Sequence, residues 1–397
     1  MWLTCWWTVE QSNDPHASSM AQPTARQTTR LPWELILQIV NCFSPQRPDA
    51  ILPASDAATK ALVALTRVCR SIYPAASSLL YQHCVYVDSR ERAMALARTL
   101  SPRKEGSVLF PREITKIFLG PYPNARDSDS TSSDDSVSPL DDRPLALCIH
   151  DLLTTVAPTL RTLVIDMPLR SLYPEDDTNG VRLLLRQGFT SLEHLEAFVS
   201  VRDELYLAVL HPRDYSLPVW VDYWPNLRRL SLYNEDFDRD MMWSCVASKR
   251  HLEMAIFARP DGTGSDSEDE QAIEGWRRLA GINVKRAWIE ALEMGSSGNE
   301  QQHLTTRDLT TRITLVFADS DILSQPDFSN FEREWQELDP ENRIEILLAD
   351  VPAPIVLEDD AVGGAEVNHP ELTQEFVKKL ALEGKLWDKD GPWIRRT

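Results

Sequence analysis

Residues 159–166 read TLRTLVID, and this short stretch decides the fold class of the chain. A leucine is followed by two polar residues and then by a run of apolar residues, which is the pattern of a buried strand. Similar stretches recur as SLEHLEAF at 191–198, NLRRLSLY at 226–233 and HLEMAIFA at 251–258. Their leading leucines are Leu160, Leu192, Leu227 and Leu252.

The spacing of these stretches predicts repeated units. The leading leucines lie 32, 35 and 25 residues apart, and this leaves room for a strand, a helix and a loop in each unit. The runs ITLVFAD (313–319) and IEILLAD, which ends at 350, extend the series. Strands joined by crossovers of this length are parallel and their connections are right-handed. We therefore expect parallel neighbours in one curved sheet at 162–166, 194–198, 229–233 and 253–257.

The series resembles irregular leucine-rich repeats. Because the spacing varies and the asparagine of the regular repeat is missing, an ordinary α/β domain with several leucine-rich strands is the alternative interpretation. The later stretch PELTQEFVKKLALEG (370–384) predicts an amphipathic helix that begins after Pro370, with Leu372, Phe376 and Leu380 on one face. We interpret this helix as a terminal cap on the repeat stack.

A different pattern precedes these strands. LPWELILQIVNCF (31–43) predicts a helix, because Pro32 suits a first helical turn and Glu34 suits its positive end. After a proline-broken insertion, further helices are predicted at 61–73 and 75–83, and a short strand at 83–87. Three short helices bury only a small core. Their apolar residues are therefore predicted to be covered either by the rest of the chain or by another protein.

The same residues resemble the F-box family in the form common in fungal proteins. The family opens with Leu-Pro-x-Glu-Leu and an aliphatic pair, and continues with Leu-x-x-Val-Cys-Arg, an aromatic residue and a closing Leu-Leu-Tyr with a strand. The matching positions are Leu31, Pro32, Glu34, Leu35, Ile36, Ile39, Leu65, Val68, Cys69, Arg70, Tyr73, Leu79, Leu80, Tyr81 and Val85 to Val87. The chain departs from the family in an insertion at roughly 44–58, where the family has a short turn.

The resemblance implies a role in protein degradation. An F-box docks onto a Skp-type adaptor, which links it to a cullin–RING ubiquitin ligase (SCF), while the rest of the chain binds a protein target for ubiquitylation. A helix that buries apolar anchors in a groove fits this role. The resemblance assigns adaptor contacts to Leu31, Pro32, Leu35, Ile36, Ile39, Leu65, Val68, Cys69, Leu79 and Leu80. It implies no catalysis and no cofactor.

Composition narrows the class of protein further. The chain has 397 residues and a net charge of −19; residues 1–122 carry 13 Lys/Arg against 9 Asp/Glu, and the remainder carries 28 against 51. This acidic remainder argues against nucleic-acid binding, which needs a positive surface. No apolar run approaches the length of a membrane span. The six scattered cysteines form no CxxC pair and indicate a reducing compartment, so we expect a cytoplasmic or nuclear protein.

Catalytic and metal-binding motifs are missing from the sequence. The eight histidines show no HxxxH or HExxH spacing, no GxSxG elbow occurs, and GTGSDS (262–267) lacks the lysine of a phosphate loop. We therefore predict no enzyme, no cofactor and no metal site. Two alternatives to the substrate receptor remain: a protein-binding scaffold without a ubiquitin ligase, whose helices pack on its own body, and a hydrolase with an unrecognised site.

The sequence divides into five segments. Residues 1–27 are predicted to be disordered, 28–90 to form the F-box, and 91–122 to be a connector; 123–143 are predicted to form an acidic, serine-rich disordered loop. Residues 145–397 are expected to form a leucine-rich-repeat-like region with a C-terminal helix, which the resemblance makes the part that binds the target. The predicted fold class is α/β, with an N-terminal three-helix F-box followed by an irregular leucine-rich-repeat-like α/β body.

Overall fold

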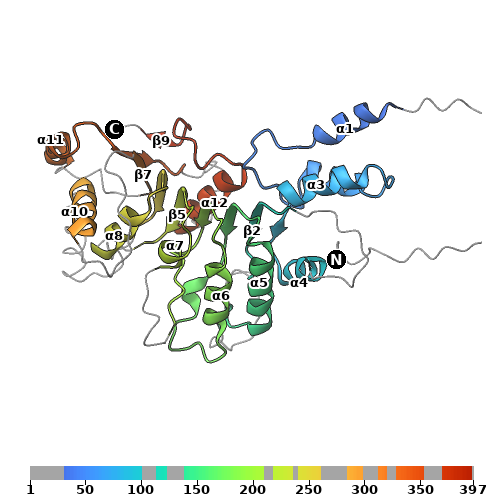
Figure 1. Cartoon of the computed structure of the whole chain (residues 1–397), viewed down its shortest axis with the longest axis horizontal. Helices are drawn as coiled ribbons and strands as arrows, with labels where there is room; N and C mark the ends of the chain where they lie inside the picture. Colours follow the sequence, from blue (N-terminus) through green and yellow to red (C-terminus); the bar gives the residue numbers. More distant parts are fainter. Residues whose placement is uncertain are drawn as a thin grey trace, which may run out of the picture.

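A computed structural model describes most of the chain between residues 31 and 395 (Figure 1). The described ranges are 31–100, 113–122, 138–209, 218–235, 240–260, 284–297, 312–319, 328–352 and 369–395. The predicted disordered segment 1–27 and residues 123–137 of the acidic loop lie outside these ranges.

One sheet organises the molecule. Among the described residues, nine strands follow each other in space in the order of the sequence, the first eight parallel and the ninth antiparallel to the eighth. They are β1 (Tyr86–Val87), β2 (Lys116–Leu119), β3 (Thr162–Ile165), β4 (Ala197–Ser200), β5 (Arg229–Tyr233), β6 (Met254–Ala258), β7 (Ile313–Ala318), β8 (Ile344–Ala349) and β9 (Ile394–Arg395). The predicted α/β class is confirmed, and the four leucine-rich stretches supply the neighbouring parallel strands β3 to β6.

The second of these stretches was placed in the wrong register. The structure pairs Thr162 with Ala197, so β4 begins three residues after the predicted strand start at 194. The residue equivalent to Leu160 is therefore Leu195 and not Leu192. Both leucines are fully buried, and for this reason the local pattern does not distinguish them.

Helices cover one face of the sheet. The helices of this layer are α4 (Arg90–Leu100), α5 (Arg143–Val156), α6 (Val181–Thr190), α7 (Val219–Asp222), α8 (Asp240–Ser248), α10 (Val284–Ser297) and α11 (Phe328–Leu338). A short 3-10 helix, η1 (Leu169–Ser171), follows β3. Alternate strand residues such as Leu163 and Leu230 pack under this layer, which forms the larger core of the protein.

The C-terminal segment covers the other face. Helix α12 (His369–Leu382) crosses the strands on the side opposite to α5 and α6 (Figure 1). Its buried face is formed by Thr373, Val377, Leu380 and Ala381, whereas Leu372 and Phe376 are only half-buried. The predicted helix is present, but its predicted role as a terminal cap is wrong. The sheet edge beside β8 is occupied by β9, and α12 buries apolar strand residues that would otherwise face water.

The N-terminal region holds three helices, as predicted, with different limits for the second. They are α1 (Trp33–Asn41), α2 (Ala57–Leu65) and α3 (Tyr73–His83). Helix α2 begins early because the Asp56 side chain accepts a hydrogen bond from the Ala58 N–H at 2.7 Å. It ends at Leu65, so Val68 and Cys69 lie in a turn and not on a helix.

The boundary between helical region and body also differs from the prediction. The strand after α3 is confirmed as β1, but it pairs with β2 and so begins the sheet of the body. The predicted connector 91–122 contributes α4 and β2 to that sheet. The body therefore starts at β1 and not at 145, because the short apolar run of β2 is itself a buried strand.

The end of the predicted disordered loop is ordered. Pro139 and Leu140 form a turn, Leu140 is buried, and Arg143 already belongs to α5. The Asp142 side chain accepts a hydrogen bond from the Leu145 N–H at 3.0 Å and caps the helix. The acidic residue that suggested disorder thus has a structural role at a helix start.

The segment between α1 and α2 fastens the helical region to the body. The Leu52 N–H donates to the His83 carbonyl of α3 at 2.7 Å, within the helical region, and the Lys116 ammonium of β2 donates to the Pro48 carbonyl and so joins the segment to the body. Lys116 Nζ also lies 3.0 Å from His83 Nδ1, which must accept because an ammonium only donates. Burial and the Lys116 charge lower the pKa of His83.

This arrangement predicts that acid weakens the protein at this junction. With its folded pKa below the ordinary value of about 6.5, His83 takes up a proton in the unfolded chain first, so stability is complete above that pH and falls as the pH drops below it. Burial raises the pKa of the neighbouring Cys84 thiol, which moves it further from this window. Denaturant unfolding between pH 7.5 and 5 should show a smaller loss for His83→Asn, which keeps an acceptor without a titrating ring. Equal losses would contradict the role of His83.

Candidate docking surface on the N-terminal helices

Helix α1 has a conventional start and packs on the rest of the protein through only a small buried face. Pro32 occupies the position before its first residue with extended backbone, and Glu34 lies in the first turn. On the inner side of the helix, Val40 is completely buried and Ile36 packs beside it. They contact a small core that contains Leu62, Ile72 and Ala76 from the other two helices and the turn between them.

The outer side of α1 is also apolar. Leu31 lies just before the helix start, and Leu35 and Ile39 lie one turn apart on the outer side of the helix, away from the small core. Their exposed fractions are 58%, 44% and 47%. We call these three residues the α1 stripe. In the described part of the chain no element covers it, and α1 projects beyond the end of the sheet (Figure 1).

The ten predicted adaptor contacts fall into two groups. The exposed group contains Leu31, Pro32, Leu35, Ile39, Val68 and Cys69. The other group is half-buried against the small helical core and contains Ile36, Leu65, Leu79 and Leu80. The second group therefore supports the helices that carry the surface. A substitution at one of these four positions tests folding before it tests binding.

Two features escaped the sequence-based prediction. Trp33 is 40% exposed and adds to the apolar surface at the start of α1. Ile51, in the insertion, is 1% exposed and belongs to the core under α12. The only sequence signal for Ile51 was an aliphatic pair, Ile51–Leu52, inside a polar, proline-broken segment.

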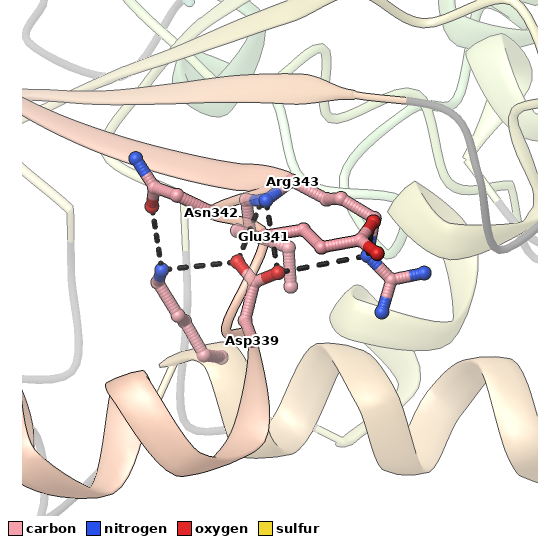
Figure 2. Close-up of polar contacts among 6 residues, drawn as sticks. Asp339, Glu341, Asn342 and Arg343 are labelled. Atoms are coloured by element: carbon pink, nitrogen blue, oxygen red, sulfur yellow. Dashed lines mark hydrogen bonds and ion pairs between the residues drawn. The ribbon is translucent and has the colours of Figure 1, made fainter.

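A polar network lies at the opposite end of the sheet (Figure 2). The buried Asp339 carboxylate accepts from the Ile344 and Arg343 backbone N–H groups, both at 2.9 Å, and from the Lys285 ammonium at 3.0 Å. Lys285 also donates to the Asn342 side chain at 2.9 Å. Burial alone would raise the pKa of Asp339, but these donors outweigh it and lower that pKa. The network fixes the turn between α11 and β8 and ties it to α10.

A second buried charge serves the loops after β3 and β4. The Arg182 guanidinium, with no exposed surface, donates to backbone carbonyls of Leu169, Leu172, Tyr206 and Ala208. Its hydrogen-bond acceptors are all backbone carbonyls, so the side chain replaces hydrogen bonds that a regular element would supply, and its guanidinium also lies over the Tyr206 ring, 4.6 Å from the centroid. Its arrangement is that of a structural group.

Other shifted groups also have backbone partners. Burial lowers the pKa of Lys249 to about 8, and its ammonium donates to the Trp224 carbonyl at 3.1 Å. Burial raises the pKa of Asp203 to about 6, and this carboxylate accepts from the Arg170 N–H at 3.1 Å. Among the described residues, no three His, Cys, Asp or Glu side chains are grouped to hold a metal ion.

Comparison of the chain with protein-family models, with curated proteins and with solved structures finds no match. Within the described ranges, no helix combines the length and the apolar character needed to cross a membrane. The geometry alone therefore defines the class of the protein. The chain is an α/β protein with a sequentially ordered parallel sheet, and its N-terminal helices present an apolar stripe that no other described element covers.

Proposed function

We propose that the chain is a non-catalytic F-box substrate receptor. In this proposal the α1 stripe docks onto a Skp-type adaptor of a cullin–RING ubiquitin ligase, and the α/β body binds the protein target. The observation that carries it is the exposure of Leu31, just before α1, and of Leu35 and Ile39 on a helix that already buries its inner side. The motif resemblance in 31–87 names the kind of partner.

The energetics require a surface wider than the stripe. Fully burying a Leu or Ile side chain is worth about 1.5–3 kcal/mol, and these side chains are already about half-buried, so the stripe offers roughly 3 kcal/mol in total. Association itself costs about 4 kcal/mol or more. Partner contacts must therefore extend to neighbouring exposed residues. Trp33 and Val68, which is 63% exposed in the turn after α2, are the apolar candidates.

The body fits a target-binding role of the leucine-rich-repeat type. Its strands follow in sequential order and the crossover helices share one face, as in an array of repeated units. Leu160, Leu195, Leu227 and Leu252 each precede a strand and are fully buried. Open sheets that bind nucleotides place the ligand where the strand order reverses, and the described strands do not reverse. These features support a protein-binding body.

The scaffold alternative makes a different prediction about the stripe. If the helices served only to pack on their own body, the apolar residues of α1 would be covered by it. The insertion does pack on the body through Ile51, but the stripe is outside that contact. The exposure therefore favours an external partner. A scaffold that uses the stripe for a different protein remains the competing outcome of the experiment below.

Affinity purification from the native organism tests the proposal. The full chain should retain a Skp-type adaptor together with cullin, and a chain with Leu31, Leu35 and Ile39 all changed to Ser should lose both. Proteins that both chains retain are candidate targets, because the body is unchanged. Recovery of a different partner through the stripe would favour the scaffold. Absence of the adaptor from the wild-type purification would show that the F-box assignment is wrong.

A further inference from the structure

Two segments that are far apart in the sequence meet on the sheet face opposite the helical layer. The first is the interhelical segment, residues 44–53, between α1 and α2. The second is the C-terminal strap, residues 369–395. Ile51 belongs to the same apolar core as Val377, Leu380 and Leu386 of the strap. The two segments therefore cover this face together.

Direct bonds join the two segments. The Ile51 backbone N–H donates a hydrogen bond to the Leu382 carbonyl at 2.8 Å. The Arg47 guanidinium donates to the Gly384 carbonyl at 3.3 Å and to the Asp388 carboxylate at 3.0 Å. Both side chains of the Arg47–Asp388 pair are partly exposed, so water screens the pair and it contributes mainly to the geometry of the contact.

The C-terminal strap comes very close to the interhelical segment at Gly384. Its φ of +67° ends α12 in the left-handed conformation that glycine adopts most readily. A Cβ at this position would lie 2.9 Å from the Ala50 backbone nitrogen. A side chain here is therefore excluded by the interhelical segment, in addition to the cost of the left-handed backbone.

Both segments are anchored independently to the sheet. Asp49 pairs with Arg229 at the start of β5 at 3.0 Å. In the strap, Lys378 pairs with Asp166 at the end of β3 at 2.8 Å, and β9 pairs with β8. The contact between the segments thus connects the linker of the docking helices to a fixed part of the body.

We propose that the interhelical segment and the C-terminal strap form a clasp that holds the N-terminal helices in one orientation on the body. The meaning of this for ubiquitylation rests on the proposed function: an adaptor on the α1 stripe would stand at a fixed distance from a target on the sheet. The clasp itself involves no adaptor and can be tested without one.

Hydrogen exchange on the full-length chain provides the test, because neighbouring amides report different contacts. The Ile51 N–H is bonded across the clasp, whereas the Leu52 N–H is bonded to His83 within the helical region. In Gly384→Ala, we expect Ile51 to exchange at least tenfold faster and Leu52 to change less than twofold. Spin labels at Lys60→Cys and Glu193→Cys, with the exposed Cys42 and Cys69 and also Cys5 changed to Ser, should give a broader distance distribution.

Gly180 offers a matched control. It has the same φ of +67°, but a Cβ there would meet only the flexible Arg143 guanidinium at 3.2 Å. Gly180→Ala thus carries the same backbone cost without disturbing the clasp, and both amides should exchange as in the wild type. Equal acceleration of Ile51 in the two variants, or an unchanged distance distribution in Gly384→Ala, would overturn the proposal.

A charge exchange covers the case in which Gly384→Ala does not fold. Arg47→Asp and Asp388→Arg should each accelerate Ile51 exchange, and the double variant should return it to within twofold of the wild type. Failure of the double variant to restore protection would overturn the clasp. Adaptor capture by the same variants should stay within twofold of the wild type. A wild-type chain that binds no adaptor would therefore contradict the proposed function, whereas unchanged Ile51 exchange in the variants would contradict the clasp.

Discussion

Leu35→Asp should abolish capture of the Skp-type adaptor while leaving the protein folded. The side chain is 44% exposed in the free protein, so the charge remains hydrated there and the unfolding free energy should change by no more than about 0.5 kcal/mol. In the complex the same charge is desolvated without a partner. A cost of about 4 kcal/mol weakens binding about a thousandfold. Titration of the adaptor together with denaturant unfolding measures both quantities.

Two variants on the same helix sharpen this result. Gln38→Asp introduces the same charge at an exposed polar position and should weaken adaptor binding less than tenfold. Ile36→Asp places the charge beside the buried Val40, so it should lower the stability of the helical region itself and is not a clean test of docking. A Leu35→Asp chain that binds the adaptor normally would remove the stripe from the interface. One that unfolds would show that the residue is internal, as in the scaffold alternative.

Asp339→Ala should be among the most destabilising single changes in the chain. It leaves the Lys285 charge buried and removes the acceptor of two backbone N–H groups (Figure 2). Breaking a buried pair in this way costs about 3–5 kcal/mol, which denaturant unfolding should show. Because the pKa of Asp339 is lowered in the folded protein, the contribution of this carboxylate is complete above its unfolded pKa and is lost as the pH falls through the folded one.

A surface ion pair between α10 and α11 provides the control. Arg286 on α10 pairs with Glu334 on α11 at the surface, and Glu334→Ala should cost less than about 1 kcal/mol. The double change Lys285→Met with Asp339→Asn removes both charges and should be less destabilising than Asp339→Ala, because no unpaired charge stays buried. A loss below about 1 kcal/mol in Asp339→Ala would contradict the structural role of the network.

The strands were predictable because a buried parallel strand carries its own signature. Such a strand is covered on both faces and reads as a nearly continuous apolar run, as in ITLVFA of β7 and MAIFA of β6. The leading leucine of each stretch buries beneath the helical layer, which made the repetition visible. The local pattern fits both Leu192 and Leu195 as the leading leucine of the second stretch. The register of β4 against β3 shows that it is Leu195.

The candidate docking surface was predictable in part. The sequence shows that α1 is apolar on most of its surface, and a helix of this kind is expected to be covered by other residues on more than one side. It does not show which side faces the small core. Packing decides this, since Val40 is enclosed by residues of the second and third helices, and the stripe of Leu31, Leu35 and Ile39 is left outside.

The α/β class, the succession of parallel strands and the N-terminal helices follow from the amino-acid sequence, because they depend on periodicity and on residues close together in the chain. The place of α12 and the packing of the insertion depend instead on contacts between distant segments. Ile51 meets Leu382 across most of the chain, in a segment without periodicity. Contacts of this kind depend on the shape of a surface that several distant segments build together, and no local pattern records that shape.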